Sequence, residues 1–189
     1  APGRAARVDA RARAVFESSR APRRLGHLVI GSPEPSATRA LLVEGLGMRV
    51  SDEIPDVIHF LRCSTDHHNV AIVHSTVPML QHYSFECDDV DHVGHLASGL
   101  LRLDADRHVW GLGRHFAGSN FYWYLRDPSG AFVEFYADLD QILDDDAWET
   151  RGRTEFDFSH IANAWGPNLP TEFVVPADLV SLENAWAQE

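Results

Sequence analysis

Residues 25–31 read Leu-Gly-His-Leu-Val-Ile-Gly, and residues 81–87 read Gln-His-Tyr-Ser-Phe-Glu-Cys. Both stretches are short and rich in β-branched or aromatic side chains, which is typical of β-strands. Each carries a histidine near its start, and these two residues, His27 and His82, are 55 positions apart. We interpret the two stretches as the opening strands of an internal structural repeat.

The segments that follow each opening strand support this interpretation, because both predict a helix and then three strands. The first helix is expected to begin with Ser36 as its N-cap. The second begins with acidic residues, which suit the positive end of a helix. Asp127-Pro-Ser-Gly130 predicts a turn before the last strand. The expected helices are 36–44 and 89–101, and the further strands are 48–51, 57–62, 69–74, 107–111, 120–126 and 131–136.

This element order predicts an α+β fold in which two paired βαβββ modules form an open, curved mixed sheet around a cavity, where the side chains described below could form a metal site. Three regions are expected along the chain. Residues 1–24 form an N-terminal helix and connector, residues 25–138 the metal-binding domain, and residues 139–189 a C-terminal tail that packs on that domain. Aromatic side chains in the tail favour packing over a free end.

The N-terminal region is rich in arginine, and its pattern predicts a helix over 4–17 that packs on another part of the protein. A nucleic-acid-binding arm is the alternative interpretation. The net charge of −12 disfavours it, since phosphate binding needs a positive surface. We therefore expect no nucleic-acid partner.

Composition restricts the remaining function classes. All 16 basic residues are arginines, which excludes a lysine base or a Schiff-base lysine in this chain. No apolar stretch is long enough for a membrane span and no secretory leader is recognisable, so we expect a cytoplasmic protein without a membrane partner. Cys63 and Cys87 lie in apolar-looking strands and are expected to be reduced and buried.

Three side chains could meet in the cavity of such a sheet. His27 and His82 lie on the two opening strands, and Glu134 lies on the closing strand of the second module. Strand alternation places Glu134 on the same face as Phe132 and Tyr136. Two imidazoles and one carboxylate leave adjacent coordination positions open, which favours Fe(II) over zinc, calcium or magnesium. Mn(II) shares these ligand preferences and stays open.

Taken singly, none of these residues is diagnostic. A histidine is more often a structural residue than a ligand, and a glutamate on a strand more often faces solvent. The prediction depends on their coincidence with the repeat. We interpret the other histidines outside the motifs below as structural or surface residues: His59, His74, His92, His95, His108 and His160.

Several motifs, in order, resemble the type I extradiol (ring-cleaving catechol) dioxygenases of the vicinal oxygen chelate, or glyoxalase–bleomycin resistance, superfamily. The resemblance runs from about residue 23 to residue 138, and Trp165-Gly-Pro167 resembles the family's tail. The motifs that carry it are Leu25-Gly-His27-Leu-Val-Ile-Gly-Ser32, Phe60-Leu-Arg-Cys63, His67-His68-Asn-Val-Ala71, Gln81-His82-Tyr-Ser-Phe-Glu86, Gly113-Arg-His115 and Asp127-Pro-Ser-Gly130-Ala-Phe-Val-Glu134.

The resemblance implies extradiol cleavage of a catechol with O2, with His27, His82 and Glu134 as the iron ligands. His68 would be the acid–base residue, with His67 beside it as a structural one. His115 and Tyr124 would hydrogen-bond the substrate oxygens. A core tyrosine is the alternative for Tyr124, which lies in an aromatic run.

The sequence departs from the family pattern in two places. The connection between His68 and His82 is about one residue short, and the segment 116–120 lacks an acidic residue often found there. Two-domain relatives also carry a metal-free module before this one, and residues 1–24 resemble its connector. The resemblance therefore implies either a homo-oligomer or association with a missing N-terminal module.

Two other functions stay open. One is a different metal-dependent member of the superfamily, an isomerase or a thiol transferase, which would use a fourth ligand from the first module's closing strand. That strand reads Asn69-Val-Ala-Ile-Val73, flanked only by His68 and His74. The other is a non-catalytic small-molecule binding protein, which would not need metal and proton-transfer residues together.

Overall fold

The computed structural model describes residues 21–150 and 162–188. The strands in these ranges are β1 (Arg24–Ser32), β2 (Arg49–Ile54), β3 (Ile58–Arg62), β4 (Val70–His74), β5 (Met79–Glu86), β6 (His108–Arg114), β7 (Phe121–Arg126) and β8 (Phe132–Ala137). The helices are α1 (Pro35–Ala40), the π-helical turn Leu41–Gly45, α2 (Val90–Leu103), the 3-10 turn Ala105–Arg107, α3 (Asp145–Thr150), α5 (Thr171–Val174) and α6 (Leu179–Trp186).

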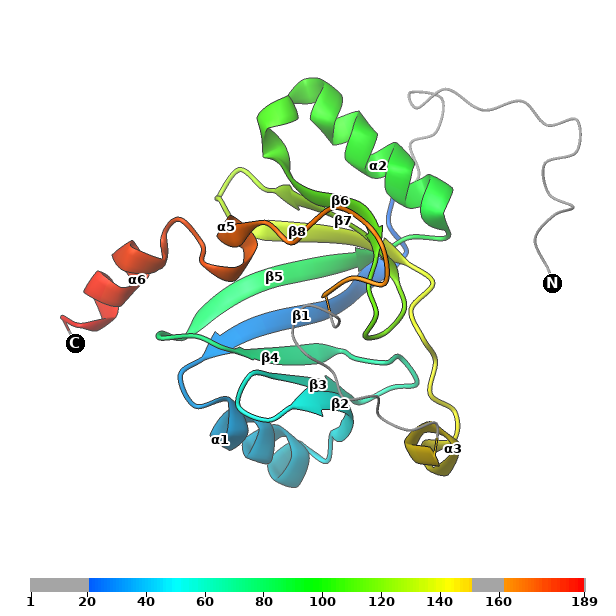
Figure 1. The fold of residues 1–189 in the computed structure, drawn as a ribbon, viewed down its shortest axis with the longest axis vertical. Coiled ribbons are helices and arrows are strands. Elements are labelled where there is room, and N and C mark those ends of the chain that lie inside the picture. Colours follow the sequence, from blue (N-terminus) through cyan, green and yellow to red (C-terminus); the bar gives the residue numbers. More distant parts are fainter. Residues whose placement is uncertain (1–20, 151–161, 189) are drawn as a thin grey trace, which may run out of the picture.

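The eight strands form one open, curved sheet in the order β2-β3-β4-β1-β5-β8-β7-β6 (Figure 1). Within each half the opening strand pairs in parallel with the closing strand, β1 with β4 and β5 with β8. The two halves join where β1 pairs antiparallel with β5. The predicted α+β class and the paired βαβββ modules are therefore confirmed.

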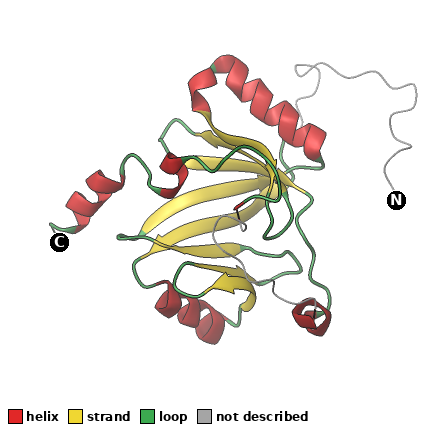
Figure 2. Cartoon of the chain, viewed as in Figure 1, coloured by secondary structure: helices red, strands yellow, loops and turns green. Residues whose placement is uncertain are grey.

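The helices α1 and α2 lie on the outer sides of the two halves, and the inner face of the sheet lies between them (Figures 1 and 2). Residues of β8 show how the sequence sets these faces. Val133, Phe135 and Ala137 pack in one cluster with α2 residues, whereas Phe132 lies in a different cluster. The alternation predicted for β8 is confirmed, and it aims Glu134 at the inner face.

The turn before β8 also forms as expected. The Oδ1 oxygen of Asp127 accepts hydrogen bonds from the backbone amides of Ser129 and Ala131, at 2.7 and 3.1 Å. Gly130 has a φ of +94°, which a residue with a side chain would adopt only with strain. This turn fixes where β8 starts and hence the strand position of Glu134.

Two details of the first module were predicted wrongly. The helix begins at Pro35 after Glu34, so Ser36 is not its N-cap; a proline suits the first helical turn because that turn needs no amide donor there. The Ser36 hydroxyl instead donates to Asp56 at 2.6 Å. Cys63 is exposed, because it follows β3 in a loop; Cys87 is buried as expected, and both are free thiols.

Some expectations lie outside the described residues, namely the helix over 4–17 and the part of the tail over 151–161, which includes His160. Elsewhere the tail contacts the sheet. Trp148 donates from Nε1 to the Ser51 carbonyl at 2.9 Å, and Trp110 donates to the Pro167 carbonyl at 2.9 Å. Phe173 of α5 packs on the inner-face ring of Phe132, with 5.3 Å between ring centroids.

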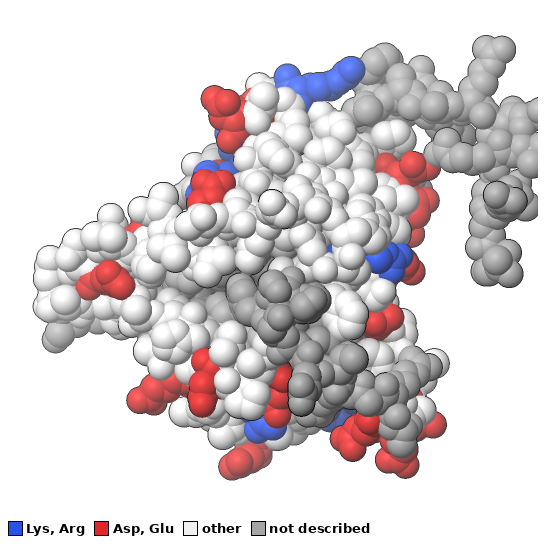
Figure 3. Space-filling view, viewed as in Figure 1, with Lys and Arg blue, Asp and Glu red and all other residues white. Residues whose placement is uncertain are grey.

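Among the described residues, no helix has the length and apolar character that crossing a bilayer requires. The face of the molecule in Figure 3 carries scattered acidic side chains and no continuous patch of described basic ones.

Candidate metal centre

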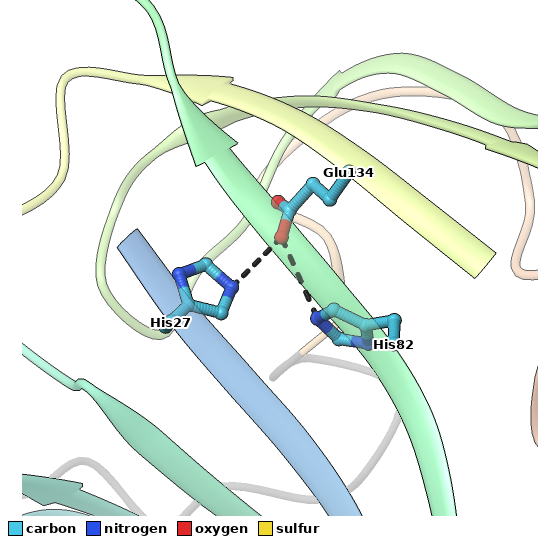
Figure 4. Close-up of side chains that lie close together, drawn as sticks. All are labelled: His27, His82 and Glu134. Carbon is cyan, nitrogen blue, oxygen red and sulfur yellow. Dashed lines mark hydrogen bonds and ion pairs between the residues drawn. The ribbon is translucent and has the colours of Figure 1, made fainter. Parts of the chain in front are cut away.

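Three adjacent strands bring their side chains to one point of the inner face. In the sheet register His27 of β1 is opposite Ser84 of β5, and Ser84 is opposite Glu134 of β8. His82 lies two residues before Ser84 on the same strand, so both point to the same face. His27, His82 and Glu134 thus meet because of strand pairing and strand parity, although they are far apart in the chain (Figure 4).

The distances within this group are short. Nε2 of His27 lies 2.8 Å from Oε2 of Glu134, and Nε2 of His82 lies 3.5 Å from the same oxygen. The possible ligand atoms of the three residues all lie within 4.8 Å of one another. The Ser84 hydroxyl donates to Oε2 of Glu134 at 2.7 Å and therefore steadies the carboxylate.

The group is buried, and its charge needs compensation. Burial alone would raise the pKa of Glu134, but the facing imidazoles of His27 and His82 hold it well below its ordinary value. Burial lowers the pKa of His82. Nε2 of His82 is buried and has no hydrogen-bond partner among the described residues. The arrangement therefore joins an ionised carboxylate with a neutral imidazole that has a free ring nitrogen.

A cation fits this arrangement. Metal ligands at right angles, each with a bond of about 2.1 Å, stand about 3 Å apart, which is near the two separations to Glu134. The second carboxylate oxygen, Oε1, accepts from Nδ2 of Asn120 at 3.1 Å. Gln81 contacts Nδ1 of His82 through Oε1, so Nδ1 donates and Nε2 keeps its lone pair. Outer hydrogen bonds of this kind orient metal ligands.

His115 and Tyr124 form a second pair beside the carboxylate. Nδ1 of His115 contacts the Ala162 carbonyl, which only accepts, so Nδ1 carries the proton. Burial lowers the pKa of His115 to about 4, which leaves the ring neutral and Nε2 unprotonated. The Tyr124 hydroxyl therefore donates to Nε2, at 2.9 Å. Burial first, and then Glu134, raise the pKa of Tyr124 well above its ordinary value, so the hydroxyl keeps its proton.

His68 lies beside His27, with 4.3 Å between ring centroids. Its Nδ1 is 3.0 Å from Nδ1 of His67, whose Nε2 is 2.8 Å from Oδ2 of Asp52. A carboxylate only accepts, so His67 donates from Nε2 and its Nδ1 is the acceptor. His68 then donates from Nδ1 and holds an unprotonated Nε2. Burial, followed by His27 and His67, lowers the pKa of His68 well below its ordinary value, so the ring is neutral.

Part of this group was not predicted. The motifs indicate a structural role for His67 and single out neither Asp52 nor Ser84, Gln81 or Asn120. Ser84 could have been predicted, because it lies on the same face of β5 as His82. In the sheet, β5 lies between β1 and β8, which carry His27 and Glu134. The role of Asp52 depends on a contact between a β2 residue and the loop after β3, and a single sequence holds no signal for that contact.

The six residues singled out from the sequence all line one cavity of about 510 Å³: His27, His68, His82, His115, Tyr124 and Glu134. Most of the other lining side chains are apolar, among them Val29, Phe60 and Phe173. The buried carboxylate of Glu134 therefore faces a cavity lined mainly by apolar side chains, as is typical of enzyme and binding sites.

Comparison with known proteins agrees with this geometry. The family profile of the glyoxalase/bleomycin resistance protein/dioxygenase superfamily matches residues 24–135, which is more than half of the chain. The chain belongs to this superfamily. The match covers both βαβββ modules, and it confirms the resemblance drawn from the motifs.

Relatives within the superfamily include ring-cleaving enzymes. Metapyrocatechase 2 of Cupriavidus necator is 36% identical over 155 residues, covering 81% of this chain and 47% of that protein. An iron-dependent extradiol dioxygenase of Rhodococcus jostii is 26% identical, covering 69% and 48%. A solved structure of homoprotocatechuate 2,3-dioxygenase from Brevibacterium fuscum is similar with a TM-score of 0.71 and 25% identity, covering 82% and 50%. The chain spans about half the length of these relatives.

Proposed function

We propose that this chain carries the metal-binding half of an extradiol dioxygenase, which cleaves a catechol-type diol with O2 at an Fe(II) held by His27, His82 and Glu134. The observation that carries the proposal is the ligand group of two imidazoles and one carboxylate beside a cavity that His68, His115 and Tyr124 also line. The names of the relatives, a metapyrocatechase and an iron-dependent extradiol dioxygenase, support it.

When bound, Fe(II) would acidify a coordinated catechol hydroxyl and hold O2 beside the ring. The ligands suit this task because two imidazoles and one carboxylate leave adjacent positions open. Mn(II) has the same ligand preferences and is the second candidate for the metal.

His68 is the proposed acid–base residue. Its unprotonated Nε2 can accept a proton from the second catechol hydroxyl and later return it to the product. Asp52 and His67 act as positioning residues, because their hydrogen bonds fix the proton of His68 on Nδ1. The depressed pKa keeps His68 neutral near neutral pH, which is the form that can accept.

His115 and Tyr124 are the proposed substrate-orienting residues. The Tyr124 hydroxyl stays protonated and can turn from His115 to donate to a substrate oxygen. Burial keeps His115 neutral, so it adds no positive charge beside the metal site. Orientation of this kind lowers the entropic part of the reaction barrier.

The register disfavours the four-ligand alternative. Ser84 faces Glu134 across β5 and β8, and the matching pair in the first module is Val29 and Ala71. Alanine cannot bind a metal, so the closing strand of the first module supplies no fourth ligand at that position. A non-catalytic binding protein is disfavoured by the proton-transfer side chains beside the triad. Association with a second copy or with an N-terminal module, and a cytoplasmic location, stay predictions.

The test is anaerobic reconstitution with Fe(II), addition of catechol or 2,3-dihydroxybiphenyl, and admission of O2. We expect a yellow ring-opened product from the wild type. His68→Phe should lower kcat by about 10²–10⁴-fold, the range for loss of an acid–base group, and retain most of the iron. A kcat of the His68→Phe variant equal to that of the wild type would refute the proposed role of His68. A wild-type protein that binds iron and yields no product from either diol would refute the dioxygenase proposal.

A further inference from the structure

The two halves of the cavity differ in how much space they leave. On the second-module side, Phe173 of α5 packs against the rings of Tyr124 and Trp110, with centroid separations of 4.6 and 5.2 Å, as well as against Phe132. In Figure 1, α5 lies against the β5 and β8 side of the sheet. This aromatic packing narrows the second-module side of the cavity, whose apolar lining continues over the first module.

The register shows how far this extension reaches. Val29 follows His27 by two residues on β1, and its lateral neighbours are Ala71 and then Phe60. Two residues further, Gly31 is opposite Val73, and Val73 is opposite Ile58. At about 3.3 Å per residue, these two rows lie about 7 and 13 Å from the His27 row. Val29, Phe60, Val73 and Ile58 all line the cavity.

The extension is apolar, and its far end offers little to an anion. Ser75 and Thr76 line that end, and the Thr76 hydroxyl already donates to Glu183 at 2.6 Å. Asp56 and His74 are the titratable side chains that line the cavity beside Val57 and Val73. Among the described residues, none that line the cavity is an arginine. A substrate carboxylate placed here would lose part of its hydration to apolar side chains and face the acidic Asp56 with no arginine beside it, which is unfavourable.

We propose that the cavity selects catechols with an uncharged, apolar substituent about the size of a second ring, and that the substituent extends from His27 along β1 toward Val73 and Ile58. This inference rests on the proposed function, because it takes the metal site as the anchor of the diol. The cavity has a volume of about 510 Å³. Phe173 packs on its second-module side, so we place the substituent on the first-module side.

Three diols test the substrate class on the Fe(II)-loaded protein: catechol, 2,3-dihydroxybiphenyl and 3,4-dihydroxyphenylacetate. Two readouts are needed, anaerobic binding by calorimetry and kcat/KM with O2. We expect 2,3-dihydroxybiphenyl to bind at least about tenfold more tightly than catechol, because burial of apolar surface adds about 25 cal/mol per Å². The carboxylated diol should bind most weakly. Equal affinities, or a preference for the carboxylate, would overturn the inference.

The binding readout separates this inference from the proposed function. If the affinities rank as expected and no diol is cleaved, the reaction is wrong and the selectivity stands. If all three diols are cleaved with similar kcat/KM and bind equally, the reaction stands and the selectivity is wrong.

A substitution tests the direction of the substituent. Val73→Phe fills the extension and should lower the ratio of kcat/KM for 2,3-dihydroxybiphenyl to that for catechol by about tenfold or more. Val180→Phe makes the same change on α6, where Val180 is 65% exposed, and should leave the ratio unaltered. If Val73→Phe does not fold, Val73→Thr is the second test. It keeps the shape of the side chain but adds a hydroxyl, and it should weaken the binding of 2,3-dihydroxybiphenyl. An unchanged ratio in folded Val73→Phe, or unchanged binding in Val73→Thr, would refute the proposed direction.

Discussion

The two βαβββ modules share one strand order but place different side chains at matching positions. Each opening strand carries an inward histidine, His27 or His82. Two residues later the first module has Val29 opposite Ala71, whereas the second has Ser84 opposite Glu134. The second module thus supplies two of the three predicted ligands, and the first supplies one.

This difference accounts for the three-ligand character of the proposed metal centre. A symmetric pair of modules would surround a metal with four protein ligands, whereas alanine at position 71 leaves the first-module side open. The aromatic packing follows the same division: Phe173 packs on the inner face of the second module, and the apolar lining of the cavity continues over the first. We infer that the second module mainly holds the metal and the first mainly receives the substrate.

We expect the largest effect from Ala71→Glu, which would give the first module a carboxylate at the position that matches Glu134. We expect ring cleavage to fall below detection, because a fourth ligand, the second carboxylate of the set, would occupy a position that substrate or O2 needs. Metal content should be retained, which plasma emission spectroscopy measures. Ala71→Gln is the matched control for side-chain size in this fully buried position. If both variants fold and cleave catechol equally, Ala71 does not determine the open side.

A smaller effect is expected from the hydrogen-bond chain of the first module. His67→Phe removes the acceptor that holds the Nδ1 proton of His68. We expect kcat to fall about 10–100-fold, as is typical when outer-shell partners are removed. The KM should change less, and the lower arm of the pH–rate profile should move because the proton on His68 is no longer fixed. Asp52→Asn should produce a weaker form of the same change.

His59 provides the matched control for this prediction. It is a buried histidine of the same module that contacts its own carboxylate, Glu53, at 2.9 Å, and it does not line the cavity. His59→Phe should therefore alter stability but not the pH–rate profile. Equal kinetic losses in the His59 and His67 variants would indicate that His67 has only a structural role.

Much of this difference between the modules could be predicted from the sequence. Strand parity and a repeat of strands were sufficient to bring His27, His82 and Glu134 to one face, because a sheet converts alternation directly into direction. The helix start at Pro35 was missed because two residue types compete for that position. The bond between Asp52 and His67 was missed because it depends on how the loop after β3 folds over β2, and no periodic pattern encodes loop contacts.

The two cysteines give the mildest test of how the modules differ on their outer sides. Cys87 packs with Val93 and Ala97 under α2, is 2% exposed, and burial raises its pKa to about 12. Cys63 lies in the exposed loop after β3. Thiolate is the reactive form, so at pH 8 an aromatic disulfide reagent should label one thiol per folded chain. Cys63→Ser should abolish the labelling of the folded chain without changing catechol cleavage. Unfolding in guanidinium should then make Cys87 reactive. If both thiols of the folded chain react at the same rate, α2 does not seal the second module, and the contrast between a closed second half and an open first half would fail on this side of the sheet.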